Sequence, residues 1–281
     1  MTIESGIEKM EHRVGLKDKH RIIVKLGTAL ITQEDGRINL LWIEKMARVI
    51  SSLISAGKEV ILVTSGAVGA GMGIMKLEKK PTEIVEKQAL ASIGQAALLR
   101  MYETFFNEYD QVIGQVLLTR DGVENEIRRT NARNTINRLL AMGVIPVINE
   151  NDAVSTEEIE FGDNDMLAVM VAELINADLL IMLTNTDGVY TSNPHTDSNA
   201  KKVSTVTEAK KDLKGIVAEG KSNVGSGGMQ SKIEAAEICR KKNIDVVIAK
   251  GSDADVLFDI LAGRKEGTHF VSESTEVNSH K

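Results

Sequence analysis

Short apolar runs alternate with longer amphipathic stretches along most of this chain. The apolar runs predict strands at residues 21–25, 60–64, 112–118, 144–149, 179–184 and 244–250. Helical periodicity predicts helices at residues 40–56, 82–106, 130–142, 166–176 and 229–242. Continuously apolar strands separated by helices indicate a mainly parallel sheet that is covered on both faces. The pattern therefore predicts an α/β fold, a three-layer α/β/α sandwich with a mainly parallel central sheet.

Polar side chains gather where these predicted strands end. Lys25, Ser65, Asn149-Glu-Asn-Asp152 and Thr184-Asn185 each close or follow an apolar run. Because ligands of parallel α/β sheets bind beyond the carboxyl ends of the strands, we expect the functional site at this edge. Residues 185–224 show no regular period and are expected to hold hairpins.

The composition narrows the classes of function. The 281-residue chain has a net charge of −6 and only 3% aromatic residues, which argues against a nucleic-acid partner. Cys239 is the single cysteine and is expected to be a buried apolar residue. Residues 1–19 lack the apolar segment of a signal peptide, and no apolar run reaches membrane-spanning length. We expect a cytoplasmic protein with no membrane partner.

The histidines predict neither a metal site nor a general base. They are scattered in predicted tails and loops, without metal-ligand or Ser-His-Asp spacing, and we expect all five to be solvated: His12, His20, His195, His269 and His280.

A glycine-rich stretch before the last predicted helix predicts a phosphate site. Gly225, Gly227 and Gly228 precede this helix, and Lys232 lies in its first turn. Glycines let the backbone approach a ligand, the helix N-terminus offers unpaired N–H groups, and the lysine adds a positive charge. An ordinary loop that caps a surface helix is the alternative. The nearby Walker A match at residues 215–222 is interpreted as accidental, because no buried strand precedes it and no helix follows it.

Two further features support an anionic ligand. Ser65-Gly-Ala-Val-Gly-Ala-Gly-Met-Gly73 is interpreted as a loop in which Gly66 and Gly69 leave backbone N–H groups to face a small anion and Ser65 adds a hydroxyl. Tight packing of helix on sheet is the alternative, which explains one or two glycines more readily than four. Lys25 precedes a Gly turn and is well placed to meet an anion, although a solubilising lysine on an edge strand is the alternative.

Two clusters combine amides with carboxylates. Asn149-Glu-Asn-Asp152 ends a strand, and Gly162-Asp-Asn-Asp165 opens a helix. Helix capping accounts for one Asp of the second cluster but not for Asn164 and Asp165 as well. Amides can donate to a carboxylate and accept from an amino group, so the clusters suit an amino-acid ligand.

Together these motifs resemble those of the amino-acid kinase family, over residues 21–271. The resemblance rests on Val24-Lys-Leu-Gly-Thr28, Val63-Thr-Ser-Gly-Ala67, Gln88-Ala-Leu-Ala-Ser-Ile-Gly-Gln95, Ile148-Asn-Glu-Asn-Asp-Ala-Val154, Phe161-Gly-Asp-Asn-Asp165 and Gly225-Ser-Gly-Gly-Met-Gln-Ser-Lys232. The fourth and fifth motifs resemble the branch that phosphorylates the side-chain carboxylate of L-glutamate. They differ from acetylglutamate, uridylate and carbamate kinases.

The resemblance implies transfer of the γ-phosphoryl group of MgATP to glutamate, the first step of proline synthesis. Lys25 and Lys232 would neutralise the migrating group and Asp165 would hold them, with no general base and no metal ligands from the protein. Mg²⁺ would be bound mainly through the ATP phosphates. The implied glutamate-binding residues are Ser65, Gly66, Asn149, Asp152 and Asn164. The implied nucleotide-binding residues are Lys25, Thr184, Asn185, Ser226, Gly227, Gly228, Met229, Gln230, Ser231 and Lys232.

The resemblance also implies one kinase domain at residues 20–271, with an acceptor lobe at about 20–176 and a nucleotide lobe at about 177–271. Residues 1–19 would be an extension and residues 272–281 a tail. Many relatives add a C-terminal PUA domain, for which this chain is too short, and most have Asp where Asn185 stands. Proline is the implied feedback inhibitor, with residues 71–81 as our candidate for its control, and a homo-oligomer is expected. A kinase of another small acceptor and a non-catalytic sensor of nucleotide or amino acid are the alternatives.

Overall fold

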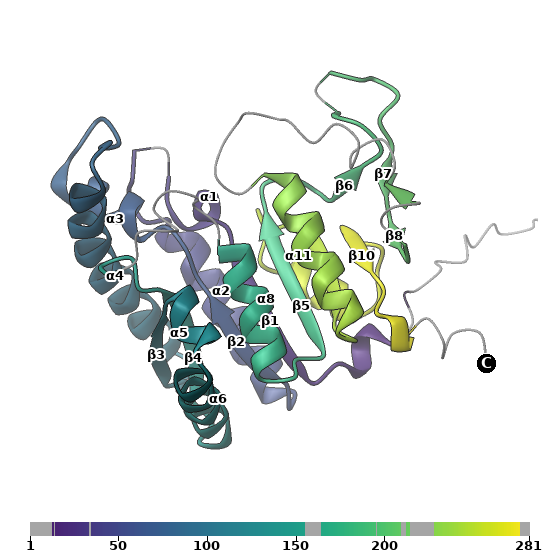
Figure 1. Ribbon diagram of the computed structural model, residues 1–281, viewed down its shortest axis with the longest axis horizontal. Coiled ribbons are helices and arrows are strands. Elements are labelled where there is room, and N and C mark those ends of the chain that lie inside the picture. Colours follow the sequence, from purple (N-terminus) through teal and green to yellow (C-terminus); the bar gives the residue numbers. More distant parts are fainter. Residues whose placement is uncertain are drawn as a thin grey trace, which may run out of the picture.

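The centre of the fold is an eight-stranded sheet (Figure 1). A computed structural model describes residues 13, 15–33, 35–154, 164–194, 196–208, 212–213 and 228–275. The strands, in sheet order, are β3 (Ile113–Leu118), β4 (Ile145–Glu150), β2 (Glu59–Val63), β1 (Arg21–Leu26), β5 (Leu179–Thr184), β9 (Asp245–Lys250), β10 (Thr268–Phe270) and β8 (Thr205–Val206). All neighbours from β3 to β9 are parallel, and β10 is antiparallel to β9. The predicted mainly parallel sheet is confirmed.

Helices cover both faces of the sheet. Successive strand residues point to opposite faces, so each buried strand contributes apolar side chains to two cores. On β1, Ile22 and Val24 join an apolar core with α2 (Leu40–Ser55), α4 (Ile84–Asn107) and α12 (Val256–Leu261). Ile23 joins a second core with α6 (Glu126–Ala141), α8 (Asn164–Leu174) and α11 (Met229–Lys241), where Cys239 is buried as expected. The three-layer sandwich is therefore confirmed. The shorter elements are η1 (Leu16–Asp18), α1 (Thr28–Ile31), α3 (Ala67–Met75), α5 (Arg120–Glu124) and the hairpin of β6 (Val189–Tyr190) with β7 (Lys202–Val203).

The glycine-rich stretch after β2 is mainly a helix, not the loop that the sequence predicts. Gly66, with φ of 87°, precedes α3, where only glycine is at ease in the left-handed region. A Cβ at Gly71 would overlap the carbonyl oxygen of Leu90 on α4, and one at Gly94 of α4 would overlap that of Ala67. Two glycines of this stretch, Gly71 and Gly73, serve close packing, which is the alternative that the sequence left open for one or two of them.

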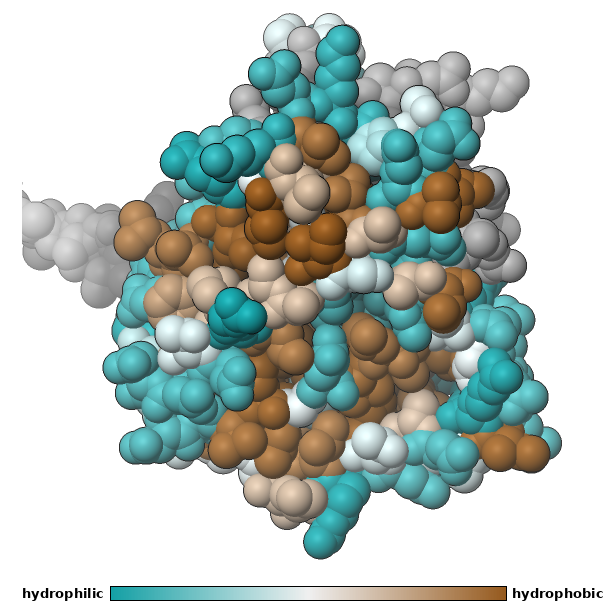
Figure 2. Space-filling model, turned by 90° about the vertical axis from the view of Figure 1, so that its left-hand side faces the viewer, coloured by the Kyte–Doolittle hydropathy of each residue, from teal (hydrophilic) through white to brown (hydrophobic). Residues whose placement is uncertain are grey.

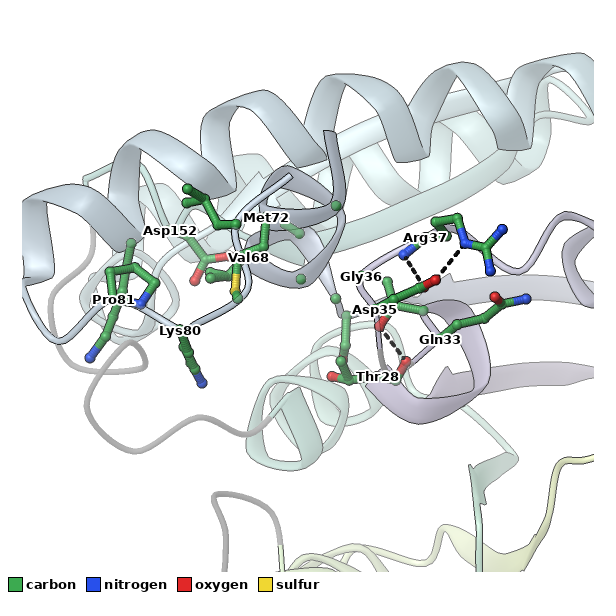
Figure 3. Close-up of a pocket in the computed structure, with 18 of the residues that line it drawn as sticks. Thr28, Gln33, Asp35, Gly36, Arg37, Val68, Met72, Lys80, Pro81 and Asp152 are labelled. Carbon is green, nitrogen blue, oxygen red and sulfur yellow. Dashed lines mark hydrogen bonds and ion pairs between the residues drawn. The ribbon is translucent and has the colours of Figure 1, made fainter. Parts of the chain in front are cut away.

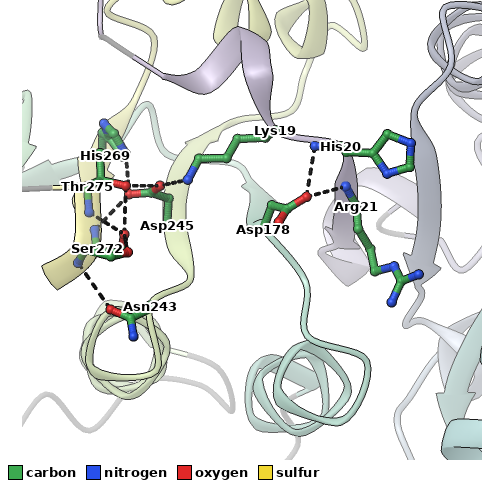
Figure 4. Close-up of polar contacts among 10 residues, drawn as sticks. Lys19, His20, Arg21, Asp178, Asn243, Asp245, His269, Ser272 and Thr275 are labelled. Carbon is green, nitrogen blue, oxygen red and sulfur yellow. Dashed lines mark hydrogen bonds and ion pairs between the residues drawn. The ribbon is translucent and has the colours of Figure 1, made fainter. Parts of the chain in front are cut away.

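Asp245 gathers side chains from both ends of the described chain (Figure 4). Its carboxylate meets Lys19 and His269, and accepts hydrogen bonds from the Ser272 N–H at 2.8 Å and the Thr275 hydroxyl at 3.1 Å. Burial opposes ionisation, but these contacts outweigh it and lower the pKa of Asp245 to about 2.

This cluster corrects one expectation about the histidines. His269 is 3% exposed and lies 3.2 Å from Asp245, so it is not solvated, because the carboxylate gives the buried ring a polar partner. His20 is exposed, whereas His12, His195 and His280 lie outside the described residues. None of the described helices has the length and apolar character needed to cross a membrane.

The contact between α3 and α4 predicts an unusual response to Gly94→Ala. Replacing an interior helical glycine by alanine normally stabilises a helix by about 1 kcal/mol. Here the added methyl group would overlap backbone atoms of α3, and we expect the free energy of unfolding to fall by about 2 kcal/mol or more. Urea unfolding measures this free energy. Gly69→Ala on α3 is the control, because the atom nearest to its added Cβ would be Thr32 Oγ1 at 3.4 Å, an ordinary contact. A stabilised Gly94→Ala variant would contradict the packing described here.

Candidate active site

The predicted polar residues meet at the carboxyl edge of the sheet. β1 lies between β2 and β5, and β4 pairs with β2, all in parallel. Lys25 on β1, Ser65 after β2, Asn149 on β4 and Thr184 on β5 therefore lie at the same edge, as predicted.

Two lysines share one buried carboxylate at this edge. Lys25 Nζ lies 2.6 Å from Asp165 Oδ1, and Lys232 Nζ lies 2.9 Å from Asp165 Oδ2. The three side chains are 5%, 8% and 0% exposed. They come from the end of β1 and from the first turns of α8 and α11. Because Lys25 is buried on a central strand, its interpretation as a solubilising edge lysine is wrong.

This group gathers two cations on one buried carboxylate. Burying such charges costs free energy unless they are well paired. The Ser231 hydroxyl also donates to Asp165 Oδ2 at 3.2 Å, which brings a second residue of the first turn of α11 to this carboxylate. The arrangement can stabilise negative charge that is brought between the two lysines.

A network of amides adjoins this group through Asn164, which precedes Asp165. Asn164 Nδ2 donates to the Thr64 carbonyl, to Ser65 Oγ at 3.2 Å and to Asn149 Oδ1 at 2.7 Å. Asn164 Oδ1 is buried and accepts no hydrogen bond from the described residues. It is therefore available to a ligand that donates.

A cavity of about 1270 Å³ opens over this network. Its lining includes all five predicted glutamate-binding residues: Ser65, Gly66, Asn149, Asp152 and Asn164. In Figure 3, Asp152 lies beside Val68 and Met72, with Lys80 and Pro81 on one side and Asp35 and Arg37 on the other. The first turn of α3, whose N–H groups have no partner within the helix, also lines the cavity.

The cavity contains a carboxyl group with a raised pKa. Burial, and then the charge of nearby Glu150, raise the pKa of Asp152 to about 6. The ionised form of Asp152 therefore predominates above pH 6 and suits a cationic group of a ligand.

The predicted nucleotide-binding residues are placed in part. Thr184 ends β5, and its hydroxyl donates to Asn185 Oδ1 at 3.2 Å. Gly228 precedes α11, and a Cβ there would meet open space, so packing does not require this glycine. Met229, Gln230, Ser231 and Lys232 form the first turn of α11. Ser226, Gly227 and the Walker A match at 215–222 lie outside the described residues.

Sequence analysis did not assign Gln95 and Tyr102 to the site, but both lie on α4 and contact residues of the amide network. Gln95 Oε1 accepts a hydrogen bond from Asn149 Nδ2 at 2.6 Å, and the Tyr102 hydroxyl lies 2.7 Å from Thr64 Oγ1. Gln95 closes one of the family motifs, which was the available signal. In the part of the chain that the structure describes, no three His, Cys, Asp or Glu side chains converge as metal ligands do.

Comparison with known proteins identifies the family. Residues 20–250 match the amino acid kinase family. A glutamate 5-kinase of Clostridium perfringens is 47% identical over 268 residues, covering 94% of this chain and 100% of that protein. A glutamate 5-kinase of Listeria innocua is 45% identical, covering 94% and 97%. The solved UMP kinase of Bacillus anthracis shares the fold, with a TM-score of 0.63 at 19% identity, covering 91% of this chain and 97% of that one. The chain therefore belongs to the amino acid kinase family.

Proposed function

We propose that this protein transfers the γ-phosphoryl group of ATP to the side-chain carboxylate of L-glutamate, which begins proline synthesis. Relatives that share 45–47% of its residues over 94% of the chain are glutamate 5-kinases. The observation that carries the proposal is the pair of buried lysines on Asp165, next to a cavity lined with amides and a carboxylate.

Glutamate occupies the cavity in this proposal. Its ammonium group meets Asp152 and the unpartnered Asn164 Oδ1, two acceptors that suit a cation. Ser65, Gly66 and Asn149 complete the glutamate site. The N–H groups at the start of α3 and the lysines of the rim, Lys76, Lys80 and Lys87, favour the two carboxylates.

ATP lies on the other side of the lysines. The first turn of α11 and residues 226–228 receive its phosphates, and Thr184 and Asn185 bind the nucleotide. Gly228 has the open space that a close phosphate needs. Both oxygens of Asp165 already face lysines, so Mg²⁺ would be held mainly by ATP phosphates and water, as is common for this ion.

The reaction needs little covalent help from the protein. An oxygen of the glutamate carboxylate, already ionised at neutral pH, forms a bond to the γ-phosphorus while the bond to the ADP oxygen breaks. No proton has to be removed, so no general base is needed. Lys25 and Lys232 stabilise the charge of the migrating phosphoryl group, and Asp165 keeps the two ammonium groups in position.

The proposal extends to the two lobes of the domain, to the location of the protein in the cell and to feedback inhibition. Residues 20–176 form the acceptor lobe and residues 177–271 the nucleotide lobe, in a cytoplasmic enzyme. Proline acts as feedback inhibitor through residues 71–81. Residues 71–75 belong to α3. The residues of 71–81 that line the cavity, which supports this position for control, are Met72, Gly73, Lys76, Leu77, Glu78, Lys80 and Pro81.

An apolar face supports the proposed homo-oligomer. Figure 2 shows apolar residues gathered on the side of the molecule that bears β3 and α4. Val85 and Ile93 on α4, with Val112 and Leu117 at β3, are 37–69% exposed. β3 ends the sheet among the described strands and carries no charged residue, although exposed edge strands are usually protected by charge. A second copy would cover this face through a two-fold interface.

Glutamate-dependent formation of a hydroxamate in the presence of ATP and hydroxylamine tests the reaction, because hydroxylamine traps an acyl phosphate. In an assay coupled to ADP release, which detects any phosphoryl acceptor, we expect turnover with glutamate and not with acetylglutamate, aspartate or UMP. Lys232→Ala should lower turnover by roughly tenfold to a thousandfold, the scale of one lost transition-state contact. Product with another acceptor alone would indicate a different kinase, and no turnover despite ligand binding would indicate a sensor.

The pKa of Asp152 predicts how glutamate binding depends on pH. A raised pKa means that Asp152 becomes protonated as the pH falls below about 6, and it then no longer attracts the ammonium group. We expect the KM for glutamate to rise about tenfold from pH 8 to pH 5, while the KM for ATP changes little. The control is the Asp152→Asn variant, measured by steady-state kinetics. Its KM for glutamate should be high at every pH, because residue 152 then no longer ionises. The same pH profile in both proteins would exclude this role.

Sedimentation analysis tests the oligomer. We expect wild-type protein to sediment at a multiple of the 30.6 kDa chain mass, and the Ile93→Glu/Val112→Glu variant to sediment as a monomer, because two buried charges would oppose the interface. Ile238→Glu, on an exposed position of α11, is the matched control. An unchanged mass for the double variant would place the interface elsewhere.

A further inference from the structure

The amide network has a direction that runs from the backbone to α4. The Thr64 carbonyl can only accept, so the NH₂ group of Asn164 must face it. The same NH₂ group donates to Asn149 Oδ1, which requires the NH₂ group of Asn149 to point the other way. There it meets Gln95 Oε1 at 2.6 Å. Each amide in the series therefore determines the orientation of the next.

Gln95 reaches this position because α4 lies unusually close to α3. The absence of a Cβ at Gly94 lets α4 approach the backbone at Ala67. Tyr102, seven residues after Gln95 and so on the same side of the helix, contacts Thr64 at the other end of the network. α4 thus holds the network at Asn149 and, through Thr64, near Asn164.

The network leaves one acceptor for a ligand. Among the buried side-chain atoms that lack a partner in the described chain, Asn164 Oδ1 is the one carried by a residue of the cavity lining. Its orientation follows from the donors and acceptors above, and Asn149 can accept from Asn164 only while its own NH₂ group faces an acceptor. Gln95 supplies that acceptor and is itself not among the residues that line the cavity.

We propose that Gln95 is a positioning residue for amino-acid recognition: it fixes the amide of Asn149, and through it the carbonyl of Asn164 that accepts from the substrate ammonium group. This inference rests on the proposed function. It assigns a part in substrate specificity to a residue that does not line the cavity, and it makes the polarity of residue 95 matter more than its size or charge.

Three variants of similar size separate polarity from charge. Gln95→Glu keeps an acceptor for Asn149, Gln95→Met removes it, and Gln95→Lys offers a donor that would turn Asn149 so that two NH₂ groups face each other. We expect the KM for glutamate to stay within about threefold of wild type for Glu, to rise about five- to tenfold for Met, and to rise further for Lys. The kcat of the Glu and Met variants should change by less than about twofold.

Simple electrostatics predicts the opposite order, because glutamate carries a net negative charge that Lys would attract and Glu would repel. The order Lys, Met, Glu from lowest to highest KM, or equal values for all three, would therefore overturn the proposal. Glutarate, which lacks the ammonium group, serves as a competitive inhibitor in the same assay. Its inhibition constant should stay within about twofold in every variant, whereas general damage to the cavity would raise it together with the glutamate KM.

Two controls complete the experiment. Gln111→Met removes a glutamine whose side-chain amide donates to the Tyr109 carbonyl at 3.3 Å, away from the amide network, and it should behave as wild type. Thermal unfolding confirms that each variant is folded, and if Gln95→Lys is not, the comparison of Glu with Met alone decides. A wild-type protein that forms no glutamyl hydroxamate would refute the proposed function, whereas an active wild type with an unaltered Gln95→Met would refute only the role of Gln95.

Discussion

The attraction between Asp165 and two lysines organises the functional edge of this protein. The carboxylate lies at the start of α8 and is fully buried, so it needs cationic partners, and they come from β1 and α11. These three elements lie far apart in sequence, and their junction brings the start of α11 to the edge of the sheet where the amide-lined cavity opens. Burying charged groups costs free energy, which folding alone does not require. Two lysines that meet at the carboxyl edge of the sheet can stabilise a negatively charged group of a substrate.

The acceptor side depends on a different constraint, the close approach of two helices. Gly71 and Gly94 remove the methyl groups that would keep α3 and α4 apart. As a result the first turn of α3 lies at the cavity while α4 supports the amides behind it. Gly71 and Gly94 act through packing, and neither is among the residues that line the cavity. Gly66, which has a left-handed backbone, does line it.

Much of this arrangement could be predicted from the sequence, and the failures have a common cause. The buried strands, the helices between them and the polar strand ends were recognisable because apolar periodicity is a local signal. The packing role of Gly71 was not recognised because its neighbour, Leu90, belongs to another helix. His269 was taken as solvated because Asp245, on the neighbouring strand, is not visible as its partner in a sequence pattern. The motif ending at Gln95 was visible, but the orientation of an amide depends on what its neighbours donate or accept.

The cluster around Asp245 lies at the amino end of β9, whereas the lysines and the amides lie at the carboxyl ends of β1 and β4. It joins Lys19, which precedes the first strand, to Ser272 and Thr275, which follow the last. The segment before the first strand and the segment after the last one are therefore held together at the amino end of β9. Substitutions in this cluster would reduce the amount of folded enzyme in a cell, whereas each folded molecule would keep its normal turnover rate.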